Sequence, residues 1–392
     1  MKRLINISLC FLILLSCSDN NNLLEDIAVR GGYVQFKSKP TLEFNILKLD
    51  TEKVSEEIVD PNNNIQSYSL ALYHNSTVVE NFKTINSFPS NLDITVTEII
   101  NALGITEDDV KLNTKFTLVA TIVTPTGTYS GFSPNYDSNN VNQGGNTTTR
   151  LKSTGLLDAI EFDVTFFLPP PKKVRGTSFE EVAIGAATDT YERNGGLDET
   201  GDLTNRANPP YVDFTATGTG TNDEIGFNTE YYAVTGISSS GLGFSRERIG
   251  VYSLFEDYEA YPDGDQGYHI EDADGGIRIT FDTVEIPADE VQSGVSFDVY
   301  FNDTSWESKD GLYAYANIVY RDNTTAKRDI IELYDNDVEA VAGSWKTFVI
   351  NSSGTGFLKN VKSYELVIEA QSGATPESFD IDNILIYVPD NE

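Results

Sequence analysis

The stretch that decides the fold reads Gly-Val-Ser-Phe-Asp-Val-Tyr-Phe-Asn over residues 294–302. Every second residue in it is apolar: Val295, Phe297, Val299 and Phe301. Side chains point alternately to the two faces of an extended strand, so this spacing sends one set into a core and the other set away from it. The pattern predicts a half-buried antiparallel strand.

The same alternation recurs on both sides of that stretch, which places it within a larger all-β region. It is found at 277–281, 312–320, 345–350, 364–370 and 379–388. Several such strands separated by turn residues are typical of a two-sheet sandwich. We therefore expect residues 177–392 to form a jelly-roll β-sandwich.

An earlier region, residues 28–170, carries shorter β-branched and aromatic runs and predicts a smaller β-sandwich. Those runs are 33–36, 42–46, 67–73 and 116–123. One helix interrupts them, because Thr95–Gly104 offers a hydroxyl cap, apolar residues at helical spacing and a terminal glycine. The proline cluster 169–171 introduces a stiff junction, and we place a Pro-rich linker at residues 171–176.

The first residues of the chain predict a secretory signal. Met1-Lys2-Arg3 is followed by an apolar run from Leu4 to Leu15, by Ser16 and by Cys17. The run is shorter than the roughly 20 residues that span a bilayer. Leu-Leu-Ser-Cys resembles the lipobox of bacterial lipoproteins, which implies that residues 1–16 are removed and Cys17 is acylated. The asparagine-rich residues 17–27 are then expected to be a flexible tether.

Composition limits the classes of function. The chain has 27 basic and 60 acidic residues and a net charge of −33, which disfavours nucleic acid as a partner. Its only cysteines are Cys10 and Cys17, so the processed chain has no disulfide. The two histidines, His74 and His269, lie far apart in sequence, and each is expected on the surface rather than in a zinc site or a catalytic triad.

A family resemblance adds to this pattern in residues 28–134. The strand Ser67–Tyr73, the short helix 101–105 and the strand that ends at Ile122 before 124–127 resemble the N-terminal immunoglobulin-like domain of SusE-type outer-membrane lipoproteins of Bacteroidota. That resemblance implies an immunoglobulin-like fold, a lipid anchor in the outer membrane at the cell surface, and a SusC/SusD-like transporter as a partner.

A second resemblance covers most of residues 177–388. The opening Ser-Phe-Glu-Glu at 178–181 and the closing Phe-Asp-Ile-Asp-Asn-Ile at 379–384 are similar to the first and last strands of carbohydrate-binding jelly-roll modules. In such modules an acid near each end commonly shares a structural calcium ion, a role that falls here to Glu180 and Asp382. Either Glu181 or Asp380 could complete the shell, since calcium takes six to eight oxygen ligands. No organic cofactor is expected.

A ligand-binding face follows from the alternation. If the apolar set of 294–302 enters the core, Asp298, Tyr300 and Asn302 point outward, and on the next strand Tyr313, Tyr315 and Asn317 do the same. We expect these two strands to form one hairpin, with Trp306 in its loop. Aromatic planes beside amide and carboxylate groups suit sugar rings, although tyrosine is also a common strand residue and Trp306 could instead cover the end of the sandwich.

Three functions remain open. The first is a non-enzymatic surface lipoprotein that binds or presents an extracellular polysaccharide to a SusC/SusD-like transporter. The second is an accessory structural subunit of an outer-membrane complex that binds protein rather than glycan. The third is a polysaccharide-degrading enzyme, which needs only two carboxylates, although no pair is singled out by the sequence.

Overall fold

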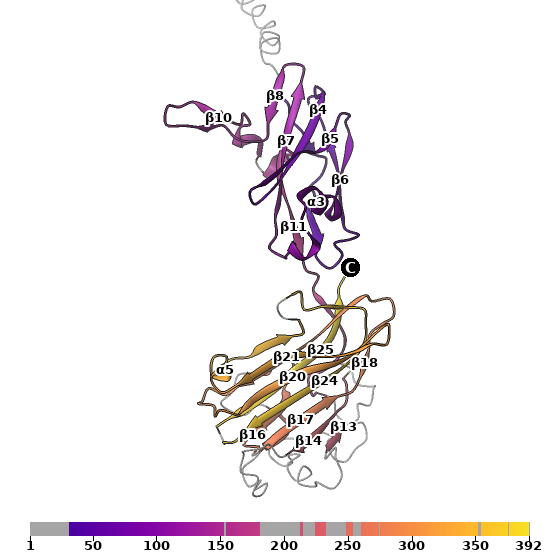
Figure 1. Ribbon diagram of the computed structural model, residues 1–392, viewed down its shortest axis with the longest axis vertical. Helices are drawn as coiled ribbons and strands as arrows, with labels where there is room; N and C mark the ends of the chain where they lie inside the picture. Colours follow the sequence, from indigo (N-terminus) through magenta and orange to yellow (C-terminus); the bar gives the residue numbers. More distant parts are fainter. Residues whose placement is uncertain are drawn as a thin grey trace, which may run out of the picture. The chain divides into compact units, whose positions relative to one another are not determined.

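A computed structural model describes residues 31–152, 154–180, 212–214, 224–232, 248–253, 260–273, 275–351, 354–374 and 376–391. The chain divides into two compact units, unit 1 (residues 1–168) and unit 2 (residues 169–392), drawn in Figure 1. The predicted signal segment, Cys17, the tether and Glu181 lie outside the described residues. Within the described ranges, no helix is both long enough and apolar enough to cross a membrane.

Unit 1 is a β-sandwich. Its smaller sheet has the order β1 (Gln35–Phe36), β3 (Lys53–Val59), β6 (Ser90–Thr95). Its larger sheet has the order β2 (Glu43–Asn45), β11 (Glu161–Phe167), β7 (Phe116–Thr124), β4 (Ser67–His74), β5 (Thr77–Ile85), with β8 (Gly127–Ser130) beside β7. Phe36 of the first sheet packs edge-on against Phe162 of the second, 5.3 Å between ring centroids, so the two sheets enclose an apolar core. This arrangement confirms the predicted immunoglobulin-like fold class.

The single predicted helix of unit 1 is α3 (Val96–Leu103). Thr95 and Glu98 form a capping box, in which each side chain bonds to the backbone N–H of the other residue. Gly104 ends the helix with φ 67°, a conformation that costs glycine little. Val96 and Ile99 are the buried residues of the helix, so its apolar stripe faces the sandwich.

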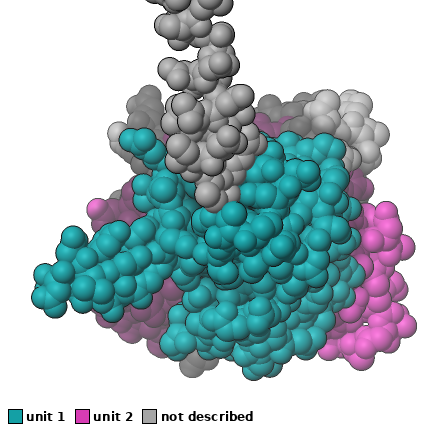
Figure 2. All heavy atoms as spheres, turned by 90° about the horizontal axis from the view of Figure 1, so that it is seen from above, with its two compact units in different colours: residues 1–168 teal, residues 169–392 magenta. Residues whose placement is uncertain are grey.

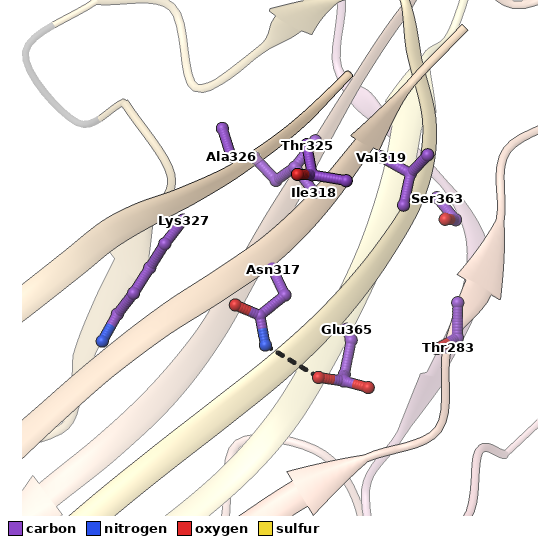
Figure 3. Close-up of a pocket in the computed structure, with 9 residues that line it drawn as sticks. All are labelled: Thr283, Asn317, Ile318, Val319, Thr325, Ala326, Lys327, Ser363 and Glu365. Carbon is purple, nitrogen blue, oxygen red and sulfur yellow. Dashed lines mark hydrogen bonds between the residues drawn. The ribbon is translucent and has the colours of Figure 1, made fainter. Parts of the chain in front are cut away.

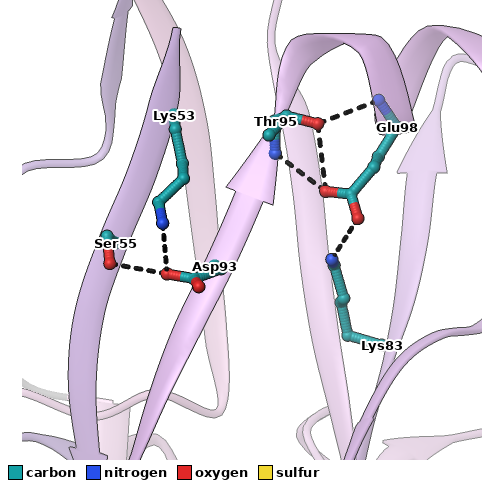
Figure 4. Close-up of polar contacts among 6 residues, drawn as sticks. All are labelled: Lys53, Ser55, Lys83, Asp93, Thr95 and Glu98. Atoms are coloured by element: carbon teal, nitrogen blue, oxygen red, sulfur yellow. Dashed lines mark hydrogen bonds and ion pairs between the residues drawn. The ribbon is translucent and has the colours of Figure 1, made fainter.

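Ion pairs continue outward from this cap, as Figure 4 shows. Lys83 on β5 approaches Glu98 to 2.6 Å and joins the helix cap to the larger sheet. On the smaller sheet, Asp93 accepts a hydrogen bond of 2.5 Å from Ser55 and lies 3.2 Å from Lys53. Both pairs are partly solvated, so each adds at most about 1 kcal/mol, and the sandwich core carries most of the stability.

An exposed hairpin projects from unit 1. It consists of β9 (Asn135–Tyr136) and β10 (Asn142–Gly144), and it appears as a lobe of the teal unit in Figure 2. Three short 3₁₀ turns also belong to unit 1: η1 (Glu107–Asp109), η2 (Thr149–Lys152) and η3 (Thr154–Leu156). The hairpin has no second layer over it, and Tyr136 is 56% exposed.

Unit 2 is a larger sandwich, in whose described residues two seven-stranded sheets can be traced. The first has the order β15 (Arg248–Ser253), β16 (Gln266–Glu271), β25 (Ser378–Pro389), β19 (Gln292–Phe301), β22 (Lys346–Val349), with β12 (Pro171–Thr177) on β25 and β23 (Leu358–Lys359) on β19. The second has the order β13 (Val212–Phe214), β14 (Phe227–Tyr232), β17 (Gly275–Phe281), β24 (Val361–Ser372), β20 (Gly311–Tyr320), β21 (Thr325–Tyr334), with β18 (Val284–Glu285) on β24. One helical turn, α5 (Asn336–Glu339), follows β21.

The core of unit 2 follows the predicted alternation. Buried residues from both sheets form one apolar cluster, which includes Val295, Phe297, Val299 and Phe301 of β19 and Leu312, Ala314, Ala316 and Ile318 of β20. The two strands contribute to this core from opposite sides, because β19 belongs to the first sheet and β20 to the second. The all-β, two-sandwich fold class is therefore confirmed.

The predicted Pro-rich linker at 171–176 is wrong, because these residues lie in strand β12. Pro171 is paired with Pro389 and Thr177 with Ile384 along the last strand of the unit. Proline is tolerated at the first position of a strand, where its missing N–H costs no ladder bond. The proline cluster thus begins the second sandwich instead of separating the two.

Candidate functional site

A partly accessible aromatic surface lies on the outer face of the second sheet of unit 2. Figure 1 shows β21, β20, β24 and β17 side by side in that sheet. On β20 the inward residues 312, 314, 316 and 318 are at most 1% exposed, whereas Tyr313 and Tyr315 are half-buried and Asn317 is exposed. The outward direction of these three side chains agrees with the alternation. We call this surface the tyrosine face, formed by Tyr313, Tyr315, Asn317, Lys327, Glu365 and Glu369.

The two tyrosines form a paired platform. Their ring centroids are 5.2 Å apart and their planes are tilted by 36°. The Tyr313 hydroxyl donates a hydrogen bond to Asp329 of β21. Burial and this carboxylate raise the pKa of Tyr313, and burial with the charge of Glu369 raises the pKa of Tyr315. Both rings therefore carry neutral hydroxyl groups at neutral pH.

Polar side chains on the neighbouring strands extend this platform by cross-strand register. Glu369 of β24 stands directly opposite Tyr313, and Glu365 opposite Asn317. Asn317 donates a hydrogen bond of 2.8 Å from its amide to Glu365. Further along the row, Arg278 of β17 donates to Glu369 at 2.8 Å.

A hollow of about 380 Å³ is lined by Asn317, Lys327 and Glu365 of the tyrosine face, but not by the two tyrosines themselves. Figure 3 shows the residues that line it, among them Lys327 and the hydrogen-bonded pair Asn317 and Glu365. Hydroxyl groups are supplied by Thr283, Thr325 and Ser363. The volume lies in the range of small-ligand pockets, and the lining offers donors and acceptors that suit a polyhydroxylated ligand.

The predicted grouping of Asp298 and Tyr300 with these residues is wrong. Both lie on β19, in the other sheet, where they are 5% and 9% exposed. β19 pairs with β25 and β22, while β20 pairs with β24 and β21, so the two consecutive strands do not form a hairpin. Strands that are adjacent in sequence often lie apart in a jelly roll, because the chain crosses between the sheets.

Trp306 also does not belong to the tyrosine face. It is 4% exposed and its ring packs 4.9 Å from Phe379 and 6.3 Å from Phe301. Its indole N–H donates to the carbonyl of Asn302 at 3.2 Å, which satisfies its one donor inside the protein. Trp306 therefore covers the end of the sandwich, which was the alternative left open by the sequence.

The predicted calcium ligands Glu180 and Asp382 are held by one loop. Glu180 accepts backbone N–H bonds from Asp265 at 2.8 Å and Gln266 at 2.6 Å, and Asp382 accepts one from Asp263 at 3.0 Å. Among the described residues, no three His, Cys, Asp or Glu side chains gather in a way that could hold a metal ion. These residues alone do not form a calcium site, and calcium binding stays a prediction.

His269 is buried, so the expectation that it lies on the surface is wrong. It is 1% exposed on β16, and its Nδ1 lies 2.8 Å from Asp380 of β25. Burial alone would lower the pKa of His269, but the charge and hydrogen bond of Asp380 raise it to about 9. Nearby, burial and the charges of Asp263 and Asp298 raise the pKa of Asp382 to about 8.

Aromatic side chains cover the acidic cluster formed by Asp263, Asp298, Asp380 and Asp382. The Trp345 ring lies 5.7 Å from Tyr261 and 5.8 Å from Tyr300, and the Tyr261 hydroxyl donates to Asp380 at 3.2 Å. This cover explains why polar side chains on the outer side of the first sheet are buried. The tyrosine face, on the other sheet, has no such cover from Trp345.

Sequence reasoning did not find four residues of the tyrosine face and its surroundings: Arg278, Lys327, Glu365 and Glu369. Each is the outward residue of an alternating strand, so periodicity could mark it as exposed. No local signal could place it beside Tyr313, because Glu369 is brought there by pairing of β20 with β24. The missing information was the strand order.

The fold and site define a two-sandwich, all-β protein with an open aromatic and polar face on its second sandwich. No protein-family model matches the chain, and no curated protein matches it. Among solved structures it is similar to a promiscuous carbohydrate-binding module of the β-sandwich superfamily, at 8% identity over 91% of this chain and 96% of that one, with a TM-score of 0.25.

Two further solved structures are similar over part of this chain. One is a carbohydrate-binding module in complex with β-1,4-galactotriose, at 12% identity over 41% of this chain and 88% of that one, with a TM-score of 0.23. The other is a Stig cyclase from Fischerella, at 12% identity over 50% of this chain and 98% of that one, with a TM-score of 0.24. The fold assignment rests on the strand order and register of this chain.

Proposed function

We propose that this protein binds an extracellular glycan on the tyrosine face and does not transform it. The observation that carries the proposal is the pair Tyr313 and Tyr315, which Lys327 connects to a hollow of about 380 Å³ lined by hydroxyl, amide and carboxylate groups. The C–H face of a pyranose packs on an aromatic ring, and its hydroxyls need both donors and acceptors. Apart from Thr283, which lies in the connection between β17 and β18, these groups stand on one sheet.

The rigidity of that sheet favours binding. The inward residues of β20 are locked in the core, so Tyr313 and Tyr315 leave a fixed backbone at a fixed spacing. Less conformational entropy is lost when a ligand meets side chains on such a strand than when it meets a loop. A chain-like ligand could lie across the neighbouring strands, where Glu365 and Glu369 continue the polar row.

Loss of either tyrosine ring is expected to weaken glycan retention. Tyr315→Ala and Tyr313→Ala should each lower affinity about tenfold, or ~1.4 kcal/mol, because an aromatic packing surface is removed. Tyr315→Phe should keep most of the binding, since the ring remains. The measurement is mobility in native gels that contain immobilised polysaccharides, with urea unfolding to verify that each variant is folded.

Tyr136→Ala supplies a matched control, because Tyr136 is an exposed tyrosine of unit 1. It should migrate like the unaltered protein in every gel. Undiminished retention of both Tyr313→Ala and Tyr315→Ala would refute the proposed site.

For localisation we propose a lipid anchor on Cys17 in the outer membrane at the cell surface, as in the SusE-type lipoproteins that residues 28–134 resemble. Support comes from the apolar run and the small residue before Cys17. Mass spectrometry of the N-terminal peptide, purified from the native host, should find an acylated cysteine. An unmodified, freely soluble chain would contradict this.

A SusC/SusD-like complex is proposed as the partner to which the glycan is presented. The alternative function, an accessory subunit of an outer-membrane complex, differs from glycan presentation only in the ligand, because the protein would then bind another protein and no sugar. Exposed Tyr136 and Val141 at the hairpin of unit 1 would offer such a contact. Pull-down after mild detergent extraction identifies the partner, and the tyrosine variants then show whether glycan retention is separate from it.

A further inference from the structure

We propose that the tyrosine face selects glycans that carry isolated uronate groups, and that Lys327 binds the uronate carboxylate. This inference deepens the proposed function and depends on it. It starts from the pairing of charges on the face. Asp329, Glu365 and Glu369 have partners there, whereas the ammonium group of Lys327 lacks an acidic one among the described residues.

Three of the acidic side chains near the tyrosines are already bound, whereas the side chain of Glu332 on β21, which stands opposite Tyr313, has no hydrogen bond or ion pair within the described residues. Glu369 and Glu230 share the guanidinium of Arg278, at 2.8 and 3.2 Å. Glu365 accepts the amide of Asn317 at 2.8 Å, and Asp329 accepts the hydroxyl of Tyr313. A ligand cation that approached Glu365, Glu369 or Asp329 would therefore compete with bonds that exist in the protein.

Lys327 has a different environment. Its Nζ lies 3.5 Å from the ring centroid of Tyr315 and 4.7 Å from that of Tyr313. No Asp or Glu within the described ranges lies at ion-pair distance from it, and its side chain is exposed. The two ring faces hold the ammonium by cation–π attraction and leave its N–H groups available to an anion.

Lys327 also lines the hollow, across from Glu365 (Figure 3). A sugar in that hollow would meet an ammonium on one side and a carboxylate with hydroxyl groups on the other. A uronate fits this asymmetry, because its carboxylate pairs with Lys327 while its ring hydroxyls donate to Glu365 and the threonine hydroxyls. A neutral hexose could make only the contacts of its hydroxyls with Glu365 and the threonine hydroxyls.

The charge of the whole chain limits how acidic the glycan can be. A net charge of −33 repels polyanions over a Debye length, so a densely charged polyuronate gains one ion pair and meets repulsion elsewhere. A neutral backbone with occasional uronate side groups avoids that repulsion. We therefore expect a preference for sparsely acidic glycans over polygalacturonate.

The test compares each acidic glycan with its own neutral form. Glucuronoxylan and gum arabic are used before and after carbodiimide–borohydride reduction, which converts their uronates to neutral sugars, and polygalacturonate serves as the densely charged probe. Native-gel affinity should fall roughly fivefold after reduction, the size of one partly exposed ion pair. Lys327→Gln should bind the original and reduced forms equally. For the unaltered protein, 0.5 M NaCl should reduce the difference in affinity between the original and the reduced glycan.

Lys359→Gln is the matched control, since Lys359 is an exposed lysine on β23 in the other sheet. It should keep the full preference. Equal affinity of the unaltered protein for both forms, or a preference that persists in Lys327→Gln, would overturn the inference. If neutral glycans are then still retained in a Tyr315-dependent way, the proposed function survives; if no glycan is retained at all, both fail.

Discussion

Replacing Trp306 by alanine is expected to destabilise unit 2 by about 3–5 kcal/mol, the usual cost of removing a buried indole. Trp306 is 4% exposed and packs on Phe301 and Phe379, so its loss leaves a cavity at the end of the sandwich. The chain has two tryptophans, and the second, Trp345, also lies in unit 2. Fluorescence of Trp345 during urea unfolding therefore reports the stability of this unit in the variant.

Trp306→Phe is the companion variant, because it fills part of the cavity with another aromatic ring. It should lose clearly less stability than Trp306→Ala. Glycan retention by the folded fraction should be unchanged in both variants. If Trp306→Ala kept the unfolding free energy unchanged but lost glycan retention, Trp306 would be part of the ligand-binding surface, which was one of the two interpretations of the sequence.

The second large effect concerns pH. We expect His269 alone to lower the free energy of unfolding of unit 2 by about 3 kcal/mol as pH rises from 6.5 to 9, because its pKa is raised to about 9 in the folded state. A raised histidine pKa means that the folded state binds the proton more tightly than the unfolded state. The resulting stability is complete below pH 6.5 and is lost as pH passes the folded-state pKa.

Asp382 acts in the same direction. Its pKa is raised to about 8 in the folded state, whereas in the unfolded state the carboxyl ionises near pH 4. Between these pH values the folded state holds a proton that the unfolded state has lost, so the free energy of unfolding falls as pH rises. Urea midpoints of tryptophan fluorescence at pH 6.5 and 9 measure the combined slope. His269→Gln should show a smaller slope, since only the histidine contribution is removed. Equal slopes in the two proteins would exclude the ion pair of His269 with Asp380 as the cause.

Much of the local structure could be predicted because it depends on short-range periodicity. The alternation in 312–320 correctly divided β20 into inward residues and outward ones, including Tyr313 and Tyr315. The cap Thr95 and the terminating Gly104 correctly bounded the helix of unit 1. In each case the determining residues lie within a few positions of one another, where backbone geometry alone fixes the direction of a side chain.

The errors share one physical cause. Asp298 and Tyr300 were grouped with Tyr313 because a short connection suggested a hairpin, yet β19 and β20 belong to opposite sheets. His269 looked isolated in the sequence, but strand pairing places it opposite Asp380, 111 residues away. Residues 171–176 were interpreted as a linker because their partner strand, β25, is far away in the sequence.

The sequence by itself determined that the folded chain is made of strands, which side of each strand enters a core, and that Tyr313 and Tyr315 face outward. Only the tertiary structure decided which outward residues meet, since that depends on strand order and register across long stretches of chain. The register of β20 with β24 and β21 puts Glu369, Glu365 and Lys327 beside the tyrosines. Alternation has a period of two residues and holds no information about which strand is the neighbour, so the tyrosine face exists only in the folded sandwich.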